Sequence, residues 1–125
     1  MNDAPVDWRP SWVSGKARER DFTIAPNWVL REVVRTRAWY ALPLILVAHT
    51  RMRMKRRQST PLTRAVWLEL GPLNQTERHA VLAHLKRVPQ IMELTVERRH
   101  RWRYRLSYGP LWAHPPPPPE PEDED

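Results

Sequence analysis

Residues 38–48 form the only long apolar run of the chain, and this run limits the folds that the chain can adopt. It is 11 residues long, whereas a helix that spans a membrane needs about 20. Basic residues flank it on both sides, and it lies too far from the N-terminus to be a signal peptide. We therefore expect a helix buried in a protein core rather than a helix that spans a membrane.

Prolines divide the 125 residues, which are enough for one domain, into short elements. Pro26 fits the first turn of a helix that is predicted to run to about Arg35. A second helix is predicted over 38–54. Because proline removes a backbone donor and clashes one turn back, this helix either begins near Leu42 or kinks at Pro43. Its expected buried face consists of Leu42, Ile45, Leu46 and His49.

Two further helices are predicted on either side of a short turn. The sequence Ser-Thr-Pro at 59–61 is typical of a helix start, with a hydroxyl cap and a proline in the first helical position. Gly71 is suited to end this helix in the left-handed conformation. Asn74 then begins the next helix, which is predicted to run to about Val88, and Glu77 completes a capping box.

Apolar positions alternate from 92 to 108, which predicts two antiparallel strands joined around 98–100. Facing residues must lie on the same side of the sheet, and the tightest register that satisfies this condition pairs Val96 with Trp102. A register two residues looser keeps the same sides, whereas a two-residue turn would place Glu97 opposite Trp102 and is rejected. The aromatic row of Trp102, Tyr104 and Tyr108 is interpreted as core rather than as a platform for single-stranded bases.

The two ends of the chain differ in composition from the middle. Residues 1–20 show no period and are predicted to be a flexible arm. The arm's Trp8 and Trp12 either dock on a neighbour or cover their own domain. Residues 113–125 are rich in proline and end in acids, so they cannot bury apolar area and are expected to be disordered. The folded domain is therefore predicted over 21–112.

The charge of the chain points to a polyanionic partner. Lys and Arg number 21 and Asp and Glu 14, which gives a formal net charge of +7. Five of the acids lie in the last six positions, so residues 1–119 carry 21 − 9 = +12. A small body this basic suggests nucleic acid or an anionic membrane surface as partner. Of these two we expect nucleic acid, and no membrane.

Composition also excludes several kinds of chemistry. The chain has no cysteine, which excludes disulfides, Cys-ligated zinc, iron–sulfur clusters and a thiol nucleophile. Three glycines are too few for a Gly-rich phosphate loop. His79 and His84 lie about 140° apart on a helix, too far to share one metal, and no serine lies in a nucleophile elbow. We expect no enzymatic activity, no cofactor and no bound metal.

The order of helix, helix, short turn, helix and basic hairpin resembles the winged helix-turn-helix DNA-binding domain. The resemblance is carried by residues 60–107, TPLTRAVWLELGPLNQTERHAVLAHLKRVPQIMELTVERRHRWRYRLS, above all by the Leu-Gly-x-Leu turn and the Leu-x-x-Leu end of the third helix. FTIAPN at 22–27 is similar to the lead-in of some winged-helix proteins of plasmids and mobile elements. Two departures are Pro89-Gln90, where such families usually have Ala-Gly or a similar pair, and a wing turn without glycine.

The resemblance implies a mainly α-helical domain with a small β-hairpin, that is, a core of three to four helices and a basic wing. It also implies that the third helix enters the major groove of double-stranded DNA, while the hairpin touches phosphate or the minor groove. On a helical wheel, Val81, Leu85 and Val88 form the buried side of this helix, and the opposite side carries small and polar residues that suit base edges. The predicted DNA-binding residues are Asn74, Gln75, Thr76, Arg78, His79, Ala83, Lys86 and Arg87 on the helix, and Arg98, Arg99, His100, Arg101 and Arg103 on the hairpin. Arg78 falls between the two faces, where it meets either a phosphate or a neighbour.

Several alternatives about partners stay open. The basic segment 51–57 either clamps a DNA backbone or only supplies the cations that favour a helix C-terminus. We expect a small transcriptional regulator or an accessory factor of a mobile element, located in the cytoplasm and associated with the nucleoid. The alternatives are RNA binding, and an adaptor whose proline-rich tail docks on another protein. Homodimer formation is compatible with each of them.

Overall fold

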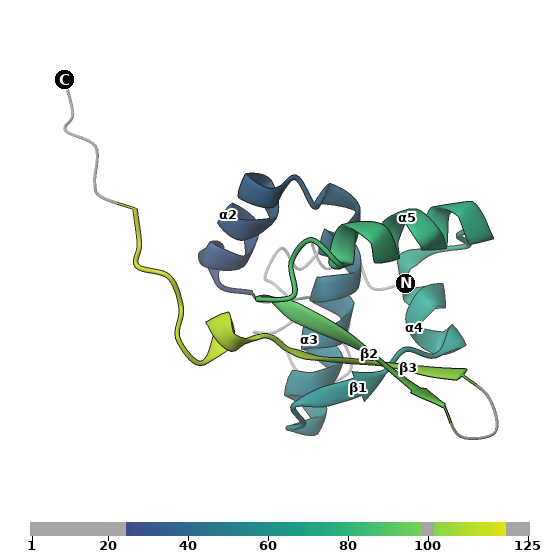
Figure 1. Cartoon of the computed structure of the whole chain (residues 1–125). Helices are drawn as coiled ribbons and strands as arrows, with labels where there is room; N and C mark the ends of the chain where they lie inside the picture. Colours follow the sequence, from purple (N-terminus) through teal and green to yellow (C-terminus); the bar gives the residue numbers. More distant parts are fainter. Residues whose placement is uncertain (1–24, 99–101, 120–125) are drawn as a thin grey trace, which may run out of the picture.

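The computed structural model of the chain describes residues 25–98 and 102–119 (Figure 1). The arm predicted over 1–20, the hairpin turn 99–101 and the acidic end of the tail lie outside the described residues. Within these ranges the chain forms four α-helices and a small antiparallel sheet of three strands. In chain order the elements are α2 (Asn27–Thr36), the 3₁₀ turn η2 (Trp39–Ala41), α3 (Leu42–Lys55), β1 (Ser59–Pro61), α4 (Arg64–Leu70), α5 (Gln75–Leu85), β2 (Met92–Arg98), β3 (Trp102–Tyr108) and the 3₁₀ turn η3 (Pro110–Trp112).

Each of the first two helices, α2 and α3, has a proline at its start. α2 begins directly after Pro26, whose extended backbone precedes the helix. α3 begins at Leu42, which is one of the two predicted solutions, and Pro43 then lies in the first turn, where its missing N–H costs no helical bond. Both helices end on an arginine in the left-handed conformation, Arg37 with φ 58° and Arg56 with φ 52°.

α3 is buried on more than one side. Ile45 and His49 are buried as predicted, but Leu42 and Leu46 are only half-buried. The further buried residues are Leu44, Ala48 and Met52. α3 contacts η2, β1 and α4, and a helix that is covered from several sides has no single apolar stripe.

Residues 59–61 do not start a helix. They form strand β1, which pairs with β3 and buries Thr60 opposite Leu106. The prediction of a helix start is wrong because backbone pairing with a distant strand outweighs the local preference, and an edge strand tolerates Pro61. α4 begins instead at Arg64, and it is followed by Gly71, whose φ of 115° is positive as expected but whose extended ψ differs from the left-handed helix.

α5 has the predicted capping box. The Glu77 N–H donates to Asn74 Oδ1 over 2.8 Å, and the Asn74 N–H donates to Glu77 Oε1 over 2.9 Å. The buried side of the helix is also the predicted one, since Val81, Leu85 and Val88 are buried. The helix itself ends at Leu85, because the chain turns there towards β2 while Val88 stays in the core.

The sheet has the strand order β1-β3-β2, so β2 and β3 form the predicted hairpin and β1 covers the other edge of β3. Val96 faces Tyr104, which is the looser of the two predicted registers, and the pairing of Val96 with Trp102 is wrong. The register is set at the base of the hairpin. There Met92 faces Tyr108, and both side chains pack into or against the core.

The segment after β3 closes the base of the sheet. The Gly109 N–H donates to the Ile91 carbonyl over 2.8 Å, and the backbone of Gln90 lies so close that no side chain fits at position 109. The Trp112 ring stacks on His49 at a centroid distance of 4.5 Å, and its Nε1–H donates to the Ile91 carbonyl over 2.8 Å. The packed body therefore includes Trp112.

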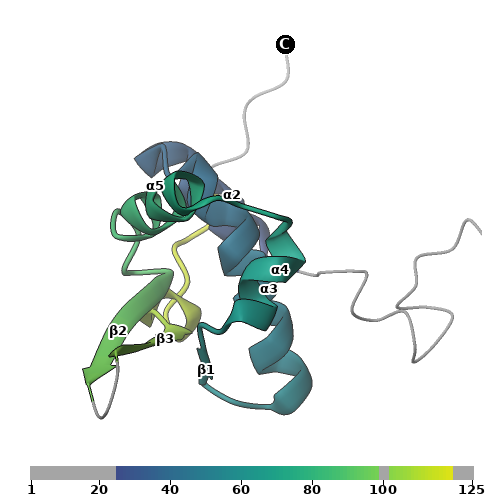
Figure 2. The ribbon, with the colours of Figure 1, turned by 90° about the vertical axis from the view of Figure 1, so that its right-hand side faces the viewer.

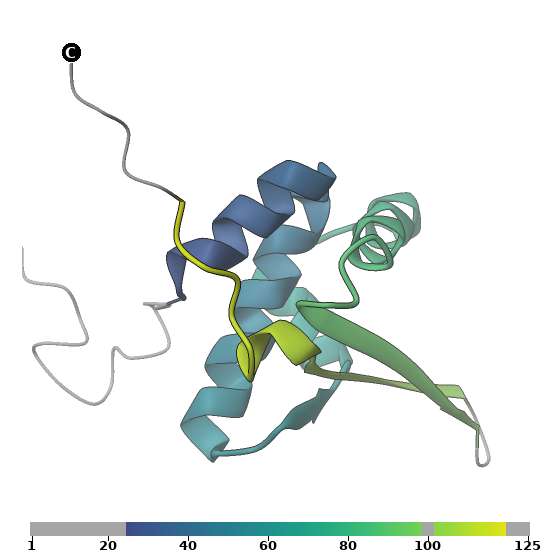
Figure 3. The same cartoon turned by 60° about the vertical axis from the view of Figure 1, so that its left-hand side comes forward.

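Figures 1 and 3 show how the elements lie relative to one another. α3 runs through the middle of the body, and α2 lies on one side of it. On the other side, α5 and the β2–β3 hairpin project in the same direction. Any ligand that touches both α5 and the hairpin therefore approaches from this side.

Candidate nucleic-acid interface

The exposed side of α5 is the first part of the candidate interface. It consists of Gln75, Thr76, His79, Ala83 and Lys86, which are all exposed. They lie away from the buried side chains of the helix, as the helical wheel predicts. The side chain of Ala83 is small, and longer polar side chains lie beside it. Such a surface lets a helix approach a partner closely and still offers donors and acceptors.

Three of the predicted helix residues have partners within the protein. Asn74 is engaged in the capping box. The Arg78 guanidinium lies over the Trp67 ring, 5.4 Å from its centroid, so this side chain contacts a neighbour. Arg87 Nη1 donates to the Arg37 carbonyl over 3.0 Å, which directs this side chain to the end of α2. Because these three side chains already have contacts within the protein, the candidate interface on α5 is reduced to the five exposed residues named above.

α5 is also held against η2. The Tyr40 N–H donates to His84 Nδ1 over 3.1 Å, and the two rings stack at a centroid distance of 4.6 Å. This bond requires an unprotonated Nδ1, and partial burial, together with the charge of Arg87, lowers the pKa of His84. The orientation of α5 is therefore fixed by contacts on the side opposite the hairpin.

The cations of the hairpin are divided between the two faces of the sheet, because alternate residues of a strand face opposite ways. Arg98 lies on the face towards α5, whereas Arg103 lies on the other face, opposite Glu97. Arg105 shares that second face and donates from Nη1 to Ser59 Oγ over 2.8 Å. The predicted residues Arg99, His100 and Arg101 lie outside the described residues.

The surface between α5 and the hairpin is hollowed. One hollow, of about 850 Å³, is lined by His79 of α5 and by Val96 and Tyr104 of the hairpin, among others. A second, of about 580 Å³, lies towards α4 and is lined by Trp67 and Arg78. His79 and Tyr104 line both hollows. α5 and the β2–β3 hairpin therefore line one shared concave surface.

Tyr104 is not a core residue, contrary to the interpretation of the aromatic row. Its side chain is 40% exposed, and that of Val96 opposite is 47% exposed, whereas Tyr108 packs against the core. The row is split because the helices cover only the base of the hairpin. Sequence reasoning missed Tyr104, Val96 and Leu82 as parts of the concave surface. Alternation shows which residues share a face, but it does not show how far that face is covered.

The described body is strongly basic. It contains 15 Lys and Arg and 5 Glu, a balance of 15 − 5 = +10. Two of the carboxylates are engaged in ion pairs, since Glu69 accepts from Arg51 Nη2 over 2.6 Å and Glu32 pairs with Arg35. Glu77 is engaged in the cap of α5. The positive charge is therefore compensated only in part.

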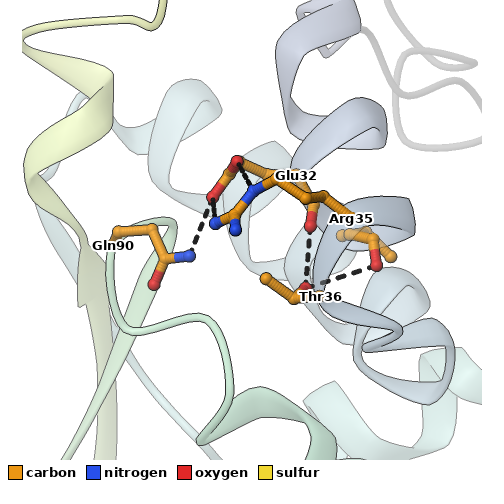
Figure 4. A network of polar contacts seen from close by, with 5 residues as sticks. Glu32, Arg35, Thr36 and Gln90 are labelled. Carbon is orange, nitrogen blue, oxygen red and sulfur yellow. Dashed lines mark hydrogen bonds and ion pairs between the residues drawn. The ribbon is translucent and has the colours of Figure 1, made fainter.

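The pair of Glu32 and Arg35 also ties α2 to the turn between α5 and β2 (Figure 4). Arg35 donates to both carboxylate oxygens over 2.7 and 2.8 Å, and Gln90 Nε2 donates to Glu32 Oε2 over 2.8 Å. The bonds from Arg35, with that from Gln90, hold the pKa of Glu32 at about 2. Pro89-Gln90 stands where the winged-helix families usually have Ala-Gly or a similar pair. In this chain the Gln90 side chain is used to bind Glu32.

The basic segment 51–57 lies apart from the exposed side of α5. Arg51 is paired with Glu69, and the exposed cations Arg53 and Lys55 belong to the last turn of α3, where they favour the helix C-terminus. Figures 1 and 2 both place this end of α3 at the end of the molecule opposite α5. The two basic regions do not form one patch.

Among the described residues, no cluster of three or more His, Asp and Glu side chains is suited to hold a metal ion. No helix in the described ranges combines the length and the apolar composition that crossing a bilayer requires.

The chain matches no known protein family, no curated protein and no solved structure.

Proposed function

We propose that the body is a winged helix-turn-helix domain. The order α3-β1-α4-α5-β2-β3 supports this assignment, because two helices joined by a short turn are followed directly by a hairpin. In this assignment α5 is the recognition helix and the β2–β3 hairpin is the wing. β1 adds a third strand that fixes the hairpin to the body.

The protein is proposed to bind double-stranded DNA with the exposed side of α5 in the major groove. The observation that carries this proposal is the row of Gln75, His79, Ala83 and Lys86 beside a hairpin that projects in the same direction (Figures 1 and 3). A major groove admits one α-helix, Gln suits adenine and Lys suits guanine. The capping box holds the first turn of α5, from which Gln75 projects.

Charge supports the same partner. A body with a balance of +10 attracts the phosphates of DNA, and Arg98 lies on the hairpin face towards α5. We propose a sequence-specific regulator of transcription or accessory factor of a mobile element, associated with the nucleoid in the cytoplasm. If the protein forms homodimers, its site will contain two half-sites about one helical turn apart.

The test is a selection of binding sites from random duplexes with the full chain, followed by affinity measurements at several salt concentrations. We expect an enriched sequence and binding that persists at physiological salt. The proposal is wrong if no sequence is enriched and the complex disappears at that salt concentration.

Single variants then separate base contacts from phosphate contacts. His79→Ala and Lys86→Ala should each change sequence preference by about 1–3 kcal/mol, because their side chains face the bases. Arg98→Ala should weaken binding to all sequences and reduce the salt slope by about one unit. Arg31→Ala is the matched control, since Arg31 is an exposed cation on α2, away from α5. Equal effects of Lys86→Ala and Arg31→Ala would contradict the placement of α5.

A further inference from the structure

The concave surface between α5 and the hairpin contains an aromatic side chain that the proposed duplex contacts do not use. Tyr104 projects between the two hollows of about 850 and 580 Å³, and it lines both of them together with His79 and Leu82. Its 40% exposure leaves part of the side chain open to a ligand. Val96 opposite is also exposed, so the floor of this surface is apolar.

Cations surround this apolar floor. Lys86 lines the first hollow and Arg78 the second, and Arg98 lies on the same face of the hairpin, at the end of β2. Glu93 is the one carboxylate among the lining residues of the two hollows. The surface thus combines an exposed aromatic ring with positive charge, which is the combination that binds a base through its ring and its backbone through phosphate.

We propose that Tyr104 stacks on an unpaired nucleobase next to the duplex that α5 contacts. The proposal rests on the proposed function, and it adds that the protein prefers DNA with a bulged or overhanging base. In a paired and stacked duplex the face of a base is covered by its neighbours, so only an unpaired base offers it to Tyr104. Both hollows are open on either side of the ring, which leaves room for such a base, and Arg78 is available to its phosphate.

Arg78 is pre-positioned for this role. Its guanidinium is held over the Trp67 ring at 5.4 Å, and its Nε is buried without a hydrogen-bond partner in the described structure. A planar guanidinium that is fixed by an aromatic ring loses little freedom when it binds a phosphate. The backbone of the unpaired nucleotide is therefore expected on the side of α4, with its base towards β2.

The test uses the full chain and two DNA probes that contain 2-aminopurine, one fully paired and one with 2-aminopurine in a single-base bulge. Stacking on Tyr104 should quench the fluorescence of the bulged probe on binding. The bulged probe should also bind about 5- to 150-fold more tightly than the paired probe, which corresponds to the stacking of one base. Tyr104→Phe keeps the ring and should retain both effects.

Tyr104→Ala should abolish the preference for the bulge while binding of the paired probe changes by less than about twofold, well below the effect of one stacked base. A thermal unfolding curve of each variant checks that the fold is retained. Binding of the paired probe without any preference for the bulge would overturn this inference and leave the proposed function intact. Loss of the preference in Tyr104→Phe as well would overturn the stacking role, and no binding of either probe would overturn the proposed function itself.

Discussion

The two halves of the β2–β3 hairpin are made of the same alternating pattern but have different surroundings. At the base, Met92 and Leu106 are 0% exposed, whereas towards the turn Val96 and Tyr104 are 47% and 40% exposed. All four lie on the face towards α5. The base is covered by the helices and the C-terminal segment, and the outer half extends beyond them (Figure 3).

The base of the hairpin is held by specific contacts, whereas its outer half is exposed. The base is fixed by the bond between Gly109 and Ile91, by the Trp112 ring, and by the hydrogen bond of 2.7 Å that His49 Nδ1 and the Tyr108 hydroxyl share. The outer half has no such cover among the described residues, and Val96 and Tyr104 are exposed there, as the proposed DNA contact requires. Substitutions at the base should therefore change stability. Substitutions in the outer half should change DNA binding instead, and at Tyr104 the change should be confined to DNA with an unpaired base.

The largest expected effect is that of Leu106→Ala at the base. Removing a fully buried leucine should lower the free energy of unfolding by about 2–5 kcal/mol. Val96→Ala, on the same face of the outer half, should change it by less than about 0.5 kcal/mol, as is usual at exposed sites. Urea unfolding of both variants measures the contrast. Similar losses in the two variants would show that the outer half is packed as well.

A smaller effect is expected for Gly109→Ala. An added Cβ would lie 2.3 Å from the carbonyl carbon and oxygen of Gln90, so the backbone must move. We expect a loss of about 1–3 kcal/mol, as for other overpacked sites. Ser107→Ala, two residues before Gly109 in β3, is the control and should be close to neutral. If the two variants have the same melting temperature, the base is less rigid than described.

The smallest expected effect concerns the tie between α2 and the base. Folding lowers the pKa of Glu32 from 4.5 to about 2, so the ionised carboxylate stabilises the fold at neutral pH. This contribution is complete above pH 4.5 and is lost as the pH falls towards 2. Glu32→Gln should therefore cost about 1 kcal/mol at pH 7 and almost nothing near pH 2, because the pair is partly exposed. Unfolding curves at both pH values check this, and an equal cost at both would contradict it.

Local signals made part of this structure predictable. The capping box at Asn74 and Glu77, the start of α3 near Leu42 and the alternation of the hairpin depend on residues that are close in sequence. The buried side of α5 also follows from its helical period. The sequence predicts these features correctly, because tertiary contacts reinforce rather than oppose the local preference.

Other features depend on contacts between distant segments. Residues 59–61 become a strand only because β3 lies beside them, and the hairpin register is fixed by packing at Met92 and Tyr108. The hydrogen bond from Arg87 Nη1 to the Arg37 carbonyl joins residues 50 apart in the chain. The exposure of Tyr104 follows from how far the helices reach over the sheet. None of these contacts leaves a periodic signal in the sequence.

Hydrogen exchange of the full chain, measured with and without a selected DNA duplex, tests the central claim most directly. The claim is that α5 and the outer half of the hairpin form the binding surface. The account predicts slower exchange over 75–86 and in the outer parts of β2 and β3 when DNA is bound, with no change over 27–36 in α2. Protection of α2 or of the end of α3, without protection of α5, would contradict it.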